Sequence, residues 1–441
     1  MTQSQRPHFT LLSIAVPLIL ANITTPLLGL VDTAILGRMD GLHFLAGAAI
    51  ASLILTQVYW ICGFLKMSVT GLSAQAKSKP QAQAMKPLLQ GGLLGFCIAL
   101  VLLMVQGPLL NAGLWFAQVT PDVAKSTSAY FHIRIWGAPA ALINLALIGW
   151  LIGQQKGKLI LLLQVVVNLI NIIASLIFVY IFDFGVKGVA LGTVVAEYAM
   201  LLFAFIIIHR QYSPITLHKK WCSLHQLKPL LSLNSDMLIR NLALQFTIAF
   251  IILKGAQFGT EAAAVNAILM QFFSLIALGL DGIANAVESL VGEQEGKGDS
   301  NGLRSQVRIG LFWSSIIALL YSLVFWLFGE NIMALLTNQD ELIRIALDYG
   351  WVIIALPLVA HWCFLFDGVY VGMTQGKTMR NNMLISTLLG FFPTYLVCEH
   401  ILGFENKALW IAMFSFLAVR GLGLGGHFLY NYGRFRAINT Q

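Results

Sequence analysis

The chain has 441 residues, of which 58% are hydrophobic and only 10% are charged, and its formal net charge is +8. Charged residues make up about a quarter of an ordinary soluble domain, so this composition excludes a soluble globular protein. Apolar stretches long enough to span a bilayer, about 18 residues or more, recur along the whole chain. We therefore expect an all-α integral membrane protein.

The basic excess is explained by the Lys and Arg residues that cytoplasmic loops of membrane proteins carry, so we expect no nucleic-acid partner. The five cysteines are scattered along the chain. Their positions show neither metal-ligand spacing nor a disulfide framework, so no metal site is predicted.

Twelve apolar segments are predicted to be membrane spans. They are residues 10–36, 44–76, 88–113, 122–151, 158–183, 185–210, 230–256, 260–292, 303–328, 341–371, 380–403 and 407–433. The longest polar break separates six spans from six. It predicts an N-terminal lobe at residues 1–210, a cytoplasmic linker at residues 211–229 and a C-terminal lobe at residues 230–441.

The basic residues set the expected orientation. If both termini are cytoplasmic, 17 Lys and Arg residues lie at inner ends and loops, and five lie in outer loops. This asymmetry is typical of an even number of spans with both ends inside.

The two halves of the sequence are weakly similar to each other. A shift of 218–219 residues aligns Asn22 with Asn241 and Gly153 with Gly372. Because six spans separate the copies, both have the same orientation, and the repeat is a parallel duplication. Many secondary transporters are built from such repeats, with a substrate path between the two lobes.

Asp32 is the only formal charge in the first span, and Pro26 precedes it by about one and a half turns. A charge at membrane depth costs roughly 2.5–3.5 kcal/mol on insertion scales, which indicates function. The alternative is that Asp32 reaches water at the helix end. Ala21, Thr25 and Gly29 share its helical face, so we expect this face to look into the lobe.

Polar side chains follow one face of the fifth span and one face of the sixth. They are Gln164, Asn168, Asn171 and Ser175, and then Thr193 and Glu197. Single groups of this kind serve as inter-helix hydrogen bonds, but four on one face favour a cavity lining. Arg134 in the fourth span lies at the depth of Glu197, and we predict that it neutralises this carboxylate.

The C-terminal lobe has different intramembrane charges, which are Arg240, Asp281, Glu288 and Asp367. We expect a charge-paired network that includes Arg240, Glu288 and Asp367. It is either purely structural or a second ion or proton site. The position that matches Asp32 in the duplication is Ile251, so the two lobes have diverged in chemistry.

Motifs for other activities are missing. The sequence has no G-x-x-x-x-G-K-[ST] motif, which argues against ATP as the energy source. The glycine-rich stretch 421–426 lies inside an apolar span with no strand before it, so it indicates helix packing. No catalytic arrangement stands out, and we expect a protein that is not an enzyme and needs no cofactor.

Several motifs resemble the multidrug and toxic compound extrusion (MATE) family, and in particular its DinF-like branch. They are Pro26 with Asp32, the stretch 171–175 in the fifth span, the stretch 185–198 around the sixth, and the second-lobe stretches 280–288 and 367–372. The resemblance covers essentially the whole chain. It implies two duplicated six-helix lobes that form a central V-shaped cavity, and export of compounds against proton or sodium entry.

The resemblance also implies roles for particular residues. Asp32 would be the protonation site, and bending at Pro26 would reshape the first-lobe cavity, with Asn171 and Thr193 as polar partners. Many relatives have Asp where this chain has Ser175. The loss of that second acid favours a proton over sodium, because Na⁺ prefers several oxygen ligands and a fixed negative charge.

We therefore predict a proton-coupled antiporter for hydrophobic or cationic compounds, monomeric and multi-pass in a bacterial inner membrane. One alternative is sodium coupling through Glu288 or Asp367. An alternative of another class is a flippase for a lipid or a lipid-linked saccharide. Such a cavity needs several basic side chains for a pyrophosphate, and the first lobe offers mainly Lys66 and Arg134.

Overall fold

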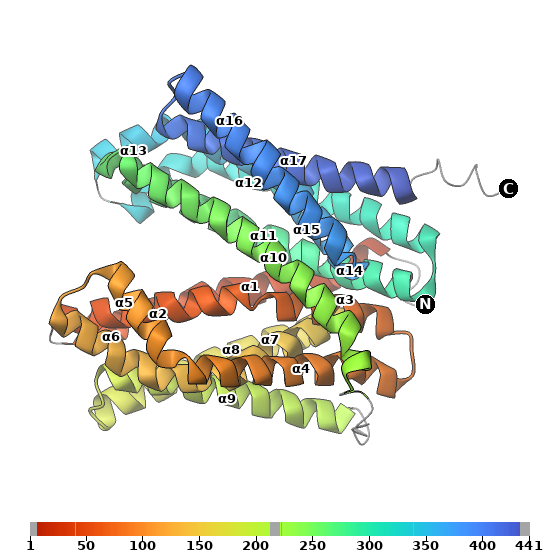
Figure 1. Ribbon diagram of the computed structural model, residues 1–441, viewed down its shortest axis with the longest axis horizontal. Coiled ribbons are helices and arrows are strands. Elements are labelled where there is room, and N and C mark those ends of the chain that lie inside the picture. Colours follow the sequence, from red (N-terminus) through yellow and green to blue (C-terminus); the bar gives the residue numbers. More distant parts are fainter. Residues whose placement is uncertain (1–6, 40, 212–220, 222, 338, 433–441) are drawn as a thin grey trace. The chain divides into compact units, whose positions relative to one another are not determined.

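The computed structural model describes residues 7–39, 41–211, 221, 223–337 and 339–432, and this part of the chain consists of helices and the short connections between them, with no strand (Figure 1). The α-helices are α1 (Pro7–Leu36), α2 (Leu42–Ile61), α3 (Phe64–Ala76), α4 (Gln81–Met104), α5 (Gln106–Ala117), α6 (Pro121–Arg134), α7 (Ala138–Gly153), α8 (Gly157–Leu176), α9 (Val186–Gln211), α10 (Leu224–Gln257), α11 (Thr260–Lys297), α12 (Ser300–Leu336), α13 (Asp340–Leu347), α14 (Gly350–Gly372), α15 (Gly376–Ile385), α16 (Phe392–Leu396) and α17 (Asn406–Tyr432).

Short segments of other helix types join some of these elements. They are the 3₁₀ turn η2 (Ile135–Gly137) and the π-helical segments η3 (Ile177–Ile181), η5 (Ser386–Phe391) and η6 (Val397–Ile401). Taken with these segments, the described residues contain 12 helical stretches long and apolar enough to cross a membrane. This confirms the predicted number of spans.

Several predicted spans have wrong boundaries. The span expected at 303–328 extends to Leu336, and the one expected at 230–256 begins at Leu224. The span expected at 88–113 begins at Gln81, because Pro87 lies inside the helix and does not start it. It ends at Met104, and α5 follows after a turn. The span expected at 341–371 is two helices, because the chain turns between Leu347 and Gly350. An apolar run does not reveal such turns, since it continues through them.

Contacts within the chain group it into two compact units. The N-unit is Leu20–Ser232, and the C-unit consists of the described residues up to Ile19 and from Leu233 onward. Helices α1 and α10 each belong partly to both. In the N-unit, α8 lies along α9, and α3 and α4 pack on α7; in the C-unit, α14 packs on α11, α12 and α17 (Figure 1).

Equivalent glycines make the same contacts in both units. A Cβ atom on Gly91 would overlap Val69, and one on Gly310 would overlap Val287 at the matching position. These glycines let the third span of each half approach the second span closely, as small residues do in membrane helix pairs. The shared contact shows the duplication in the packing itself.

The fourth span of each half is packed in the same way. A Cβ atom on Gly149 would meet the backbone carbonyl of Lys66, and one on Gly368 would meet that of Ala284. The two pairs are related by the shift that relates the two halves of the sequence. Backbone thus lies directly on backbone at the centre of each unit, and this rigid frame positions the polar residues described next.

Candidate functional site

Asp32 lies half-buried near the end of α1. Its Oδ1 atom is buried and has no hydrogen-bond partner in the part of the chain that the structure describes. Leaving a buried polar group without a partner costs about 1–3 kcal/mol, and more for a charged group. A carboxylate with a structural role is normally held by donors, so the surroundings of Asp32 fit a group that changes its protonation or its partner.

Pro26 lies on the exposed surface of α1, which continues as a helix through it. Proline has no N–H to donate to the carbonyl four residues earlier, so the helix is easier to bend at this point. Asn168 on α8 donates from Nδ2 to the backbone carbonyl of Thr24 at 3.2 Å. The side chain of Thr25 lies outside the described residues. The predicted fifth-span face therefore holds α1 directly before the proline.

The fifth span also buries two polar groups completely. Asn171 and Ser175 are both 0% exposed, and neither has a hydrogen-bond partner among the described residues. Ser175 packs on Gly192 of α9, where a Cβ atom would overlap its Oγ atom. Asn171 therefore keeps both its donor and its acceptor capacity, while Gln164 lies half-buried nearer the start of α8.

The predicted pair between Arg134 and Glu197 is confirmed. Two parallel bonds join them, from Nη1 to Oε2 at 2.9 Å and from Nη2 to Oε1 at 2.7 Å. Gly137 makes the pair possible, because a Cβ atom there would overlap the Glu197 carboxylate. The guanidinium also lies over the ring of Tyr59, 5.7 Å from its centroid. Asn144 donates to the backbone carbonyl of Glu197 at 2.9 Å.

Arg134 connects this pair to Asp32. Its guanidinium group lies within electrostatic range of the Asp32 carboxylate. Tyr130, one turn earlier on α6, is within range of both charges and lies beside Thr193. Thr193 donates from Oγ1 to the carbonyl of Val189 in its own helix at 3.1 Å. Tyr130 was not predicted, because an aromatic residue in an apolar span normally indicates packing.

The C-unit contains a triad of buried charges. Asp367 on α14 accepts through Oδ2 from Arg240 on α10 and from Arg420 on α17. Arg240 also donates to Asn241 at 2.9 Å. The two arginines are 6% and 4% exposed. The predicted contact between Arg240 and Asp367 is confirmed. Arg420 was not predicted to be part of the network, because it lies directly before the glycine-rich stretch 421–426, which indicated helix packing.

Two further acidic residues of the C-unit lie on α11. Glu288 is buried, and its backbone carbonyl lies against Gly372. Asp281 is exposed and within electrostatic range of Arg420. Ile251, which matches Asp32 in the duplication, is fully buried in the apolar core of the unit. Among the described residues, no group of three or more His, Cys, Asp or Glu side chains could hold a metal ion.

One family model matches the chain twice, over residues 17–177 and again over residues 237–396. The chain belongs to the MatE family. The MatE match in each half confirms the internal duplication. MatE proteins are membrane transporters and not enzymes, so the chain is a multi-pass membrane transporter.

Individual MatE relatives are similar over nearly the whole chain. DNA damage-inducible protein F of Escherichia coli is 37% identical over 417 residues, which are 93% of this chain and 90% of that protein. The multidrug resistance protein NorM of Vibrio cholerae is 24% identical over 446 residues, 94% of this chain and 93% of its own. These matches confirm the predicted resemblance to the DinF-like branch.

Solved structures confirm the fold. A MATE protein in complex with MaL6 has a TM-score of 0.85 at 16% identity, and the match covers 100% of both chains. A MATE in a straight conformation has a TM-score of 0.84 at 17% identity, and the match covers 100% of both chains. A MATE in a bent conformation has a TM-score of 0.85 at 17% identity, and the match covers 100% of this chain and 98% of the other. The predicted 12-helix, two-lobe fold is thus confirmed.

Proposed function

We propose that this protein is a proton-coupled exporter of amphipathic or cationic small molecules, with Asp32 as the group that carries the coupling proton. We place it as a monomer in a bacterial inner membrane with both termini in the cytoplasm. The observation that carries the proposal is the buried Oδ1 atom of Asp32, which lacks a hydrogen-bond partner on a helix that contains Pro26. The similarity of nearly the whole chain to the multidrug resistance protein NorM supports amphipathic or cationic small molecules as the substrate class.

The charges around Asp32 explain why its proton matters. Arg134 and Glu197 are paired through two hydrogen bonds and neutralise each other. Asp32 forms no ion pair among the described residues, so its protonation changes the net charge of this region. Burial in a medium of low dielectric constant generally favours the neutral form of a carboxyl group, which lets such a group exchange protons under physiological conditions.

The proposed cycle couples this charge to the shape of α1. While Asp32 is charged, it attracts Arg134 and leaves polar groups such as Asn171 available to a cationic substrate. Protonation removes the negative charge that holds both Arg134 and the cationic substrate. The helix then bends at Pro26, close to the point where Asn168 ties its backbone to α8. The bend closes the N-unit cavity and expels the substrate.

Sodium coupling through the C-unit has less support. Asp367 already accepts hydrogen bonds from two arginines, which carry more positive charge than one sodium ion would bring. A sodium ion at that carboxylate would have to displace a guanidinium group. The triad therefore fits the purely structural alternative better than an ion site.

A lipid-linked saccharide flippase also has less support. A pyrophosphate needs several basic side chains. Arg134 is held in a bidentate pair by Glu197, and this leaves Lys66 on α3 as the other basic group predicted for that cavity.

The test is ethidium transport in proteoliposomes driven either by a pH gradient without sodium or by a sodium gradient at equal pH. We expect the pH gradient to drive transport and the sodium gradient to have no effect. Asp32→Asn should abolish the pH-driven transport, because an amide cannot exchange the proton. Glu288→Gln is the matched control in the C-unit and should keep the proton dependence.

Undiminished pH-driven transport by Asp32→Asn would contradict the proposal. Transport that follows the sodium gradient and is lost in Glu288→Gln would support the C-unit alternative instead.

A further inference from the structure

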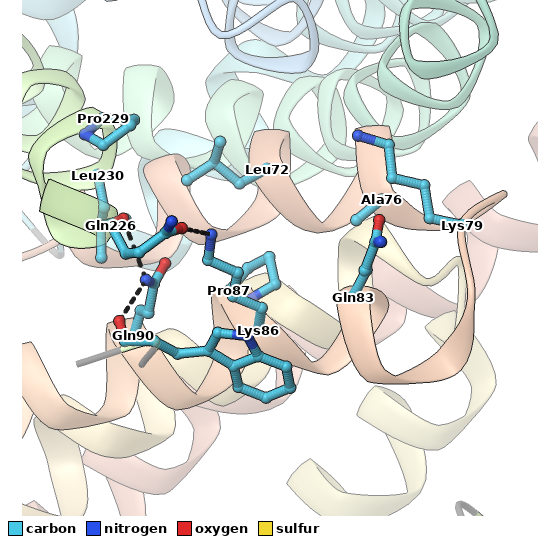
Figure 2. A pocket seen from close by; sticks show the side chains of 11 residues that line it. Leu72, Ala76, Lys79, Gln83, Lys86, Pro87, Gln90, Gln226, Pro229 and Leu230 are labelled. Carbon is cyan, nitrogen blue, oxygen red and sulfur yellow. Dashed lines mark hydrogen bonds between the residues drawn. The ribbon is translucent and has the colours of Figure 1, made fainter. Parts of the chain in front are cut away.

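A pocket of about 330 Å³ lies at one end of the N-unit, between the end of α3 and the starts of α4 and α10 (Figure 2). Its apolar lining residues include Leu72, Pro87 and Leu230. Its basic lining residues are Lys79 and Lys86. None of the residues proposed for proton coupling lines this pocket, so it is separate from the site around Asp32.

Hydrogen bonds preform the pocket. Gln90, which is 5% exposed, donates from Nε2 to the backbone carbonyls of Trp221 at 2.8 Å and Gln226 at 3.1 Å. Lys86 donates from Nζ to Oε1 of Gln226 at 2.6 Å (Figure 2). A buried amide that satisfies two backbone carbonyls fixes the start of α10 against α4. The pocket is thus built by ordered contacts and is not an accidental gap between flexible side chains.

The lysines of the pocket keep their positive charge uncompensated. The partner of Lys86 is the neutral side chain of Gln226, and an ammonium group has three donors, so two remain available. Lys79 is exposed and has no ion-pair partner among the described residues. No Asp or Glu side chain lines the pocket. The pocket therefore presents two cationic groups to any molecule that enters it.

The surrounding charges reinforce this preference. Residues 41–121 and 198–235 contain no Asp or Glu at all. Lys77 at the end of α3 donates to Gln155 in the turn between α7 and α8, so the ends of these helices lie together. Described basic residues at this end of the unit are Lys77, Lys79, Lys86, Lys156, Lys158, Arg210 and Lys228. A field of one sign attracts anions and raises their local concentration.

We propose that this pocket binds the phosphate headgroup of an anionic phospholipid from the cytoplasmic leaflet. The asymmetry of basic residues places this end of the unit in the cytoplasm. Basic pockets between spans on that side suit anionic headgroups, and each Lys near the surface strengthens the attraction. The apolar side chains of Leu72 and Leu230 suit the start of an acyl chain. Trp221, which is half-buried, also lines the pocket. Membrane proteins place tryptophan at the level of the lipid headgroups.

The lipid would connect α4 to the start of α10. That part of α10 belongs to the N-unit, and the helix continues into the C-unit from Leu233 onward. A bound headgroup would thus stabilise the contact that Gln90 and Lys86 already make with the start of α10.

The test is lipid binding to the delipidated full-length protein, measured by native mass spectrometry and by thermal unfolding in detergent. The probes are dioleoyl phosphatidylglycerol, dioleoyl phosphatidylcholine, glycerol 3-phosphate and inorganic phosphate. We expect tight binding of a single phosphatidylglycerol and much weaker binding of phosphatidylcholine. Lys79→Gln with Lys86→Gln should weaken phosphatidylglycerol binding about 25-fold, because each lysine contributes about fivefold.

The matched control is Lys156→Gln with Lys158→Gln, which removes the same charge at the same end of the unit but outside the pocket. It should have a much smaller effect, and Lys79→Arg with Lys86→Arg should retain binding. If the variant with both Lys79→Gln and Lys86→Gln does not fold, the single variant Lys79→Gln is measured instead, since Lys79 makes none of the hydrogen bonds described in the pocket.

Equal losses in the two Lys-to-Gln pairs would show a diffuse surface charge and overturn the proposal. Equal binding of phosphatidylcholine would exclude recognition of an anion. Saturation of the pocket by inorganic phosphate or glycerol 3-phosphate at concentrations that prevent lipid binding would identify it as a site for free anions, and this too would overturn a lipid site. None of these outcomes depends on proton coupling, so lipid binding is tested independently of the transport assay with Asp32→Asn.

Discussion

Asp32 and Asp367, one in each unit, have opposite surroundings. Asp32 in the N-unit has a buried oxygen without a hydrogen-bond partner, whereas Asp367 in the C-unit accepts from both Arg240 and Arg420. Both lie on membrane spans of a duplicated fold. A carboxylate that accepts from two guanidinium groups is held in its position by both. In the proposed mechanism, Asp32 carries the coupling proton, whereas Asp367 holds α10, α14 and α17 together.

Asn171 and Asn266, one buried amide in each unit, show a similar contrast. Asn171 in the N-unit uses neither its donor nor its acceptor atoms among the described residues. Asn266 in the C-unit exchanges hydrogen bonds with Asn406 at 2.8 and 3.0 Å and accepts another from Trp410 at 2.8 Å. Polar groups that are fully satisfied rigidify a core, whereas unsatisfied ones are costly and persist at sites of function.

The largest expected effect comes from making the same substitution at the two carboxylates. Asp367→Asn should lower the free energy of unfolding by about 3–5 kcal/mol, because it leaves two buried arginines without a counter-charge. Asp32→Asn removes no ion pair and should leave stability nearly unchanged. Thermal unfolding in detergent compares the two. A loss of stability in Asp32→Asn as large as that in Asp367→Asn would remove the distinction between the units.

A smaller effect is expected at the ion pair beside Asp32. Glu197→Gln should lower the free energy of unfolding by about 2–3 kcal/mol, since it leaves the buried charge of Arg134 with a weaker neutral partner. The double variant Arg134→Met with Glu197→Leu should recover most of that loss, because it removes both charges together. If the double variant is less stable than either single variant, Arg134 and Glu197 do more than neutralise each other's charge.

The smallest effect on stability is expected at Asn171. Asn171→Ala removes no hydrogen bond to a described residue and should cost less than about 1 kcal/mol, yet it should reduce ethidium transport. Asn266→Ala is the control, and it should cost about 1–3 kcal/mol because it leaves buried partners unsatisfied. Normal transport by Asn171→Ala would remove this residue from the proposed substrate site.

Much of the fold could be predicted from the sequence, because length and apolarity alone identify a span. The turns beside α5 and α13 could not, since apolar residues continue through them. Arg134 and Glu197 could be paired because only a few charges lie at that depth. Arg420 could not be added to the C-unit triad, because helix rotation decides which neighbour an arginine reaches, and no spacing within one span reveals it.

The pocket at the start of α10 shows the same limit. Lys79 and Lys86 lie seven residues apart across the turn into α4, and nothing in their spacing indicates a joint site. They line one pocket only because Gln90 and Lys86 bind residues more than 130 positions later in the chain. Contacts between segments so far apart arise from the tertiary fold and not from local patterns.

Proton release on substrate binding is the most direct test of Asp32 as the coupling group. Purified protein in weakly buffered detergent solution, without sodium, is mixed with ethidium while the pH is recorded. We expect the wild-type protein and Asp367→Asn to release protons and Asp32→Asn to release none, because substrate and proton compete through the Asp32 carboxylate. Undiminished proton release by Asp32→Asn would show that another group carries the proton.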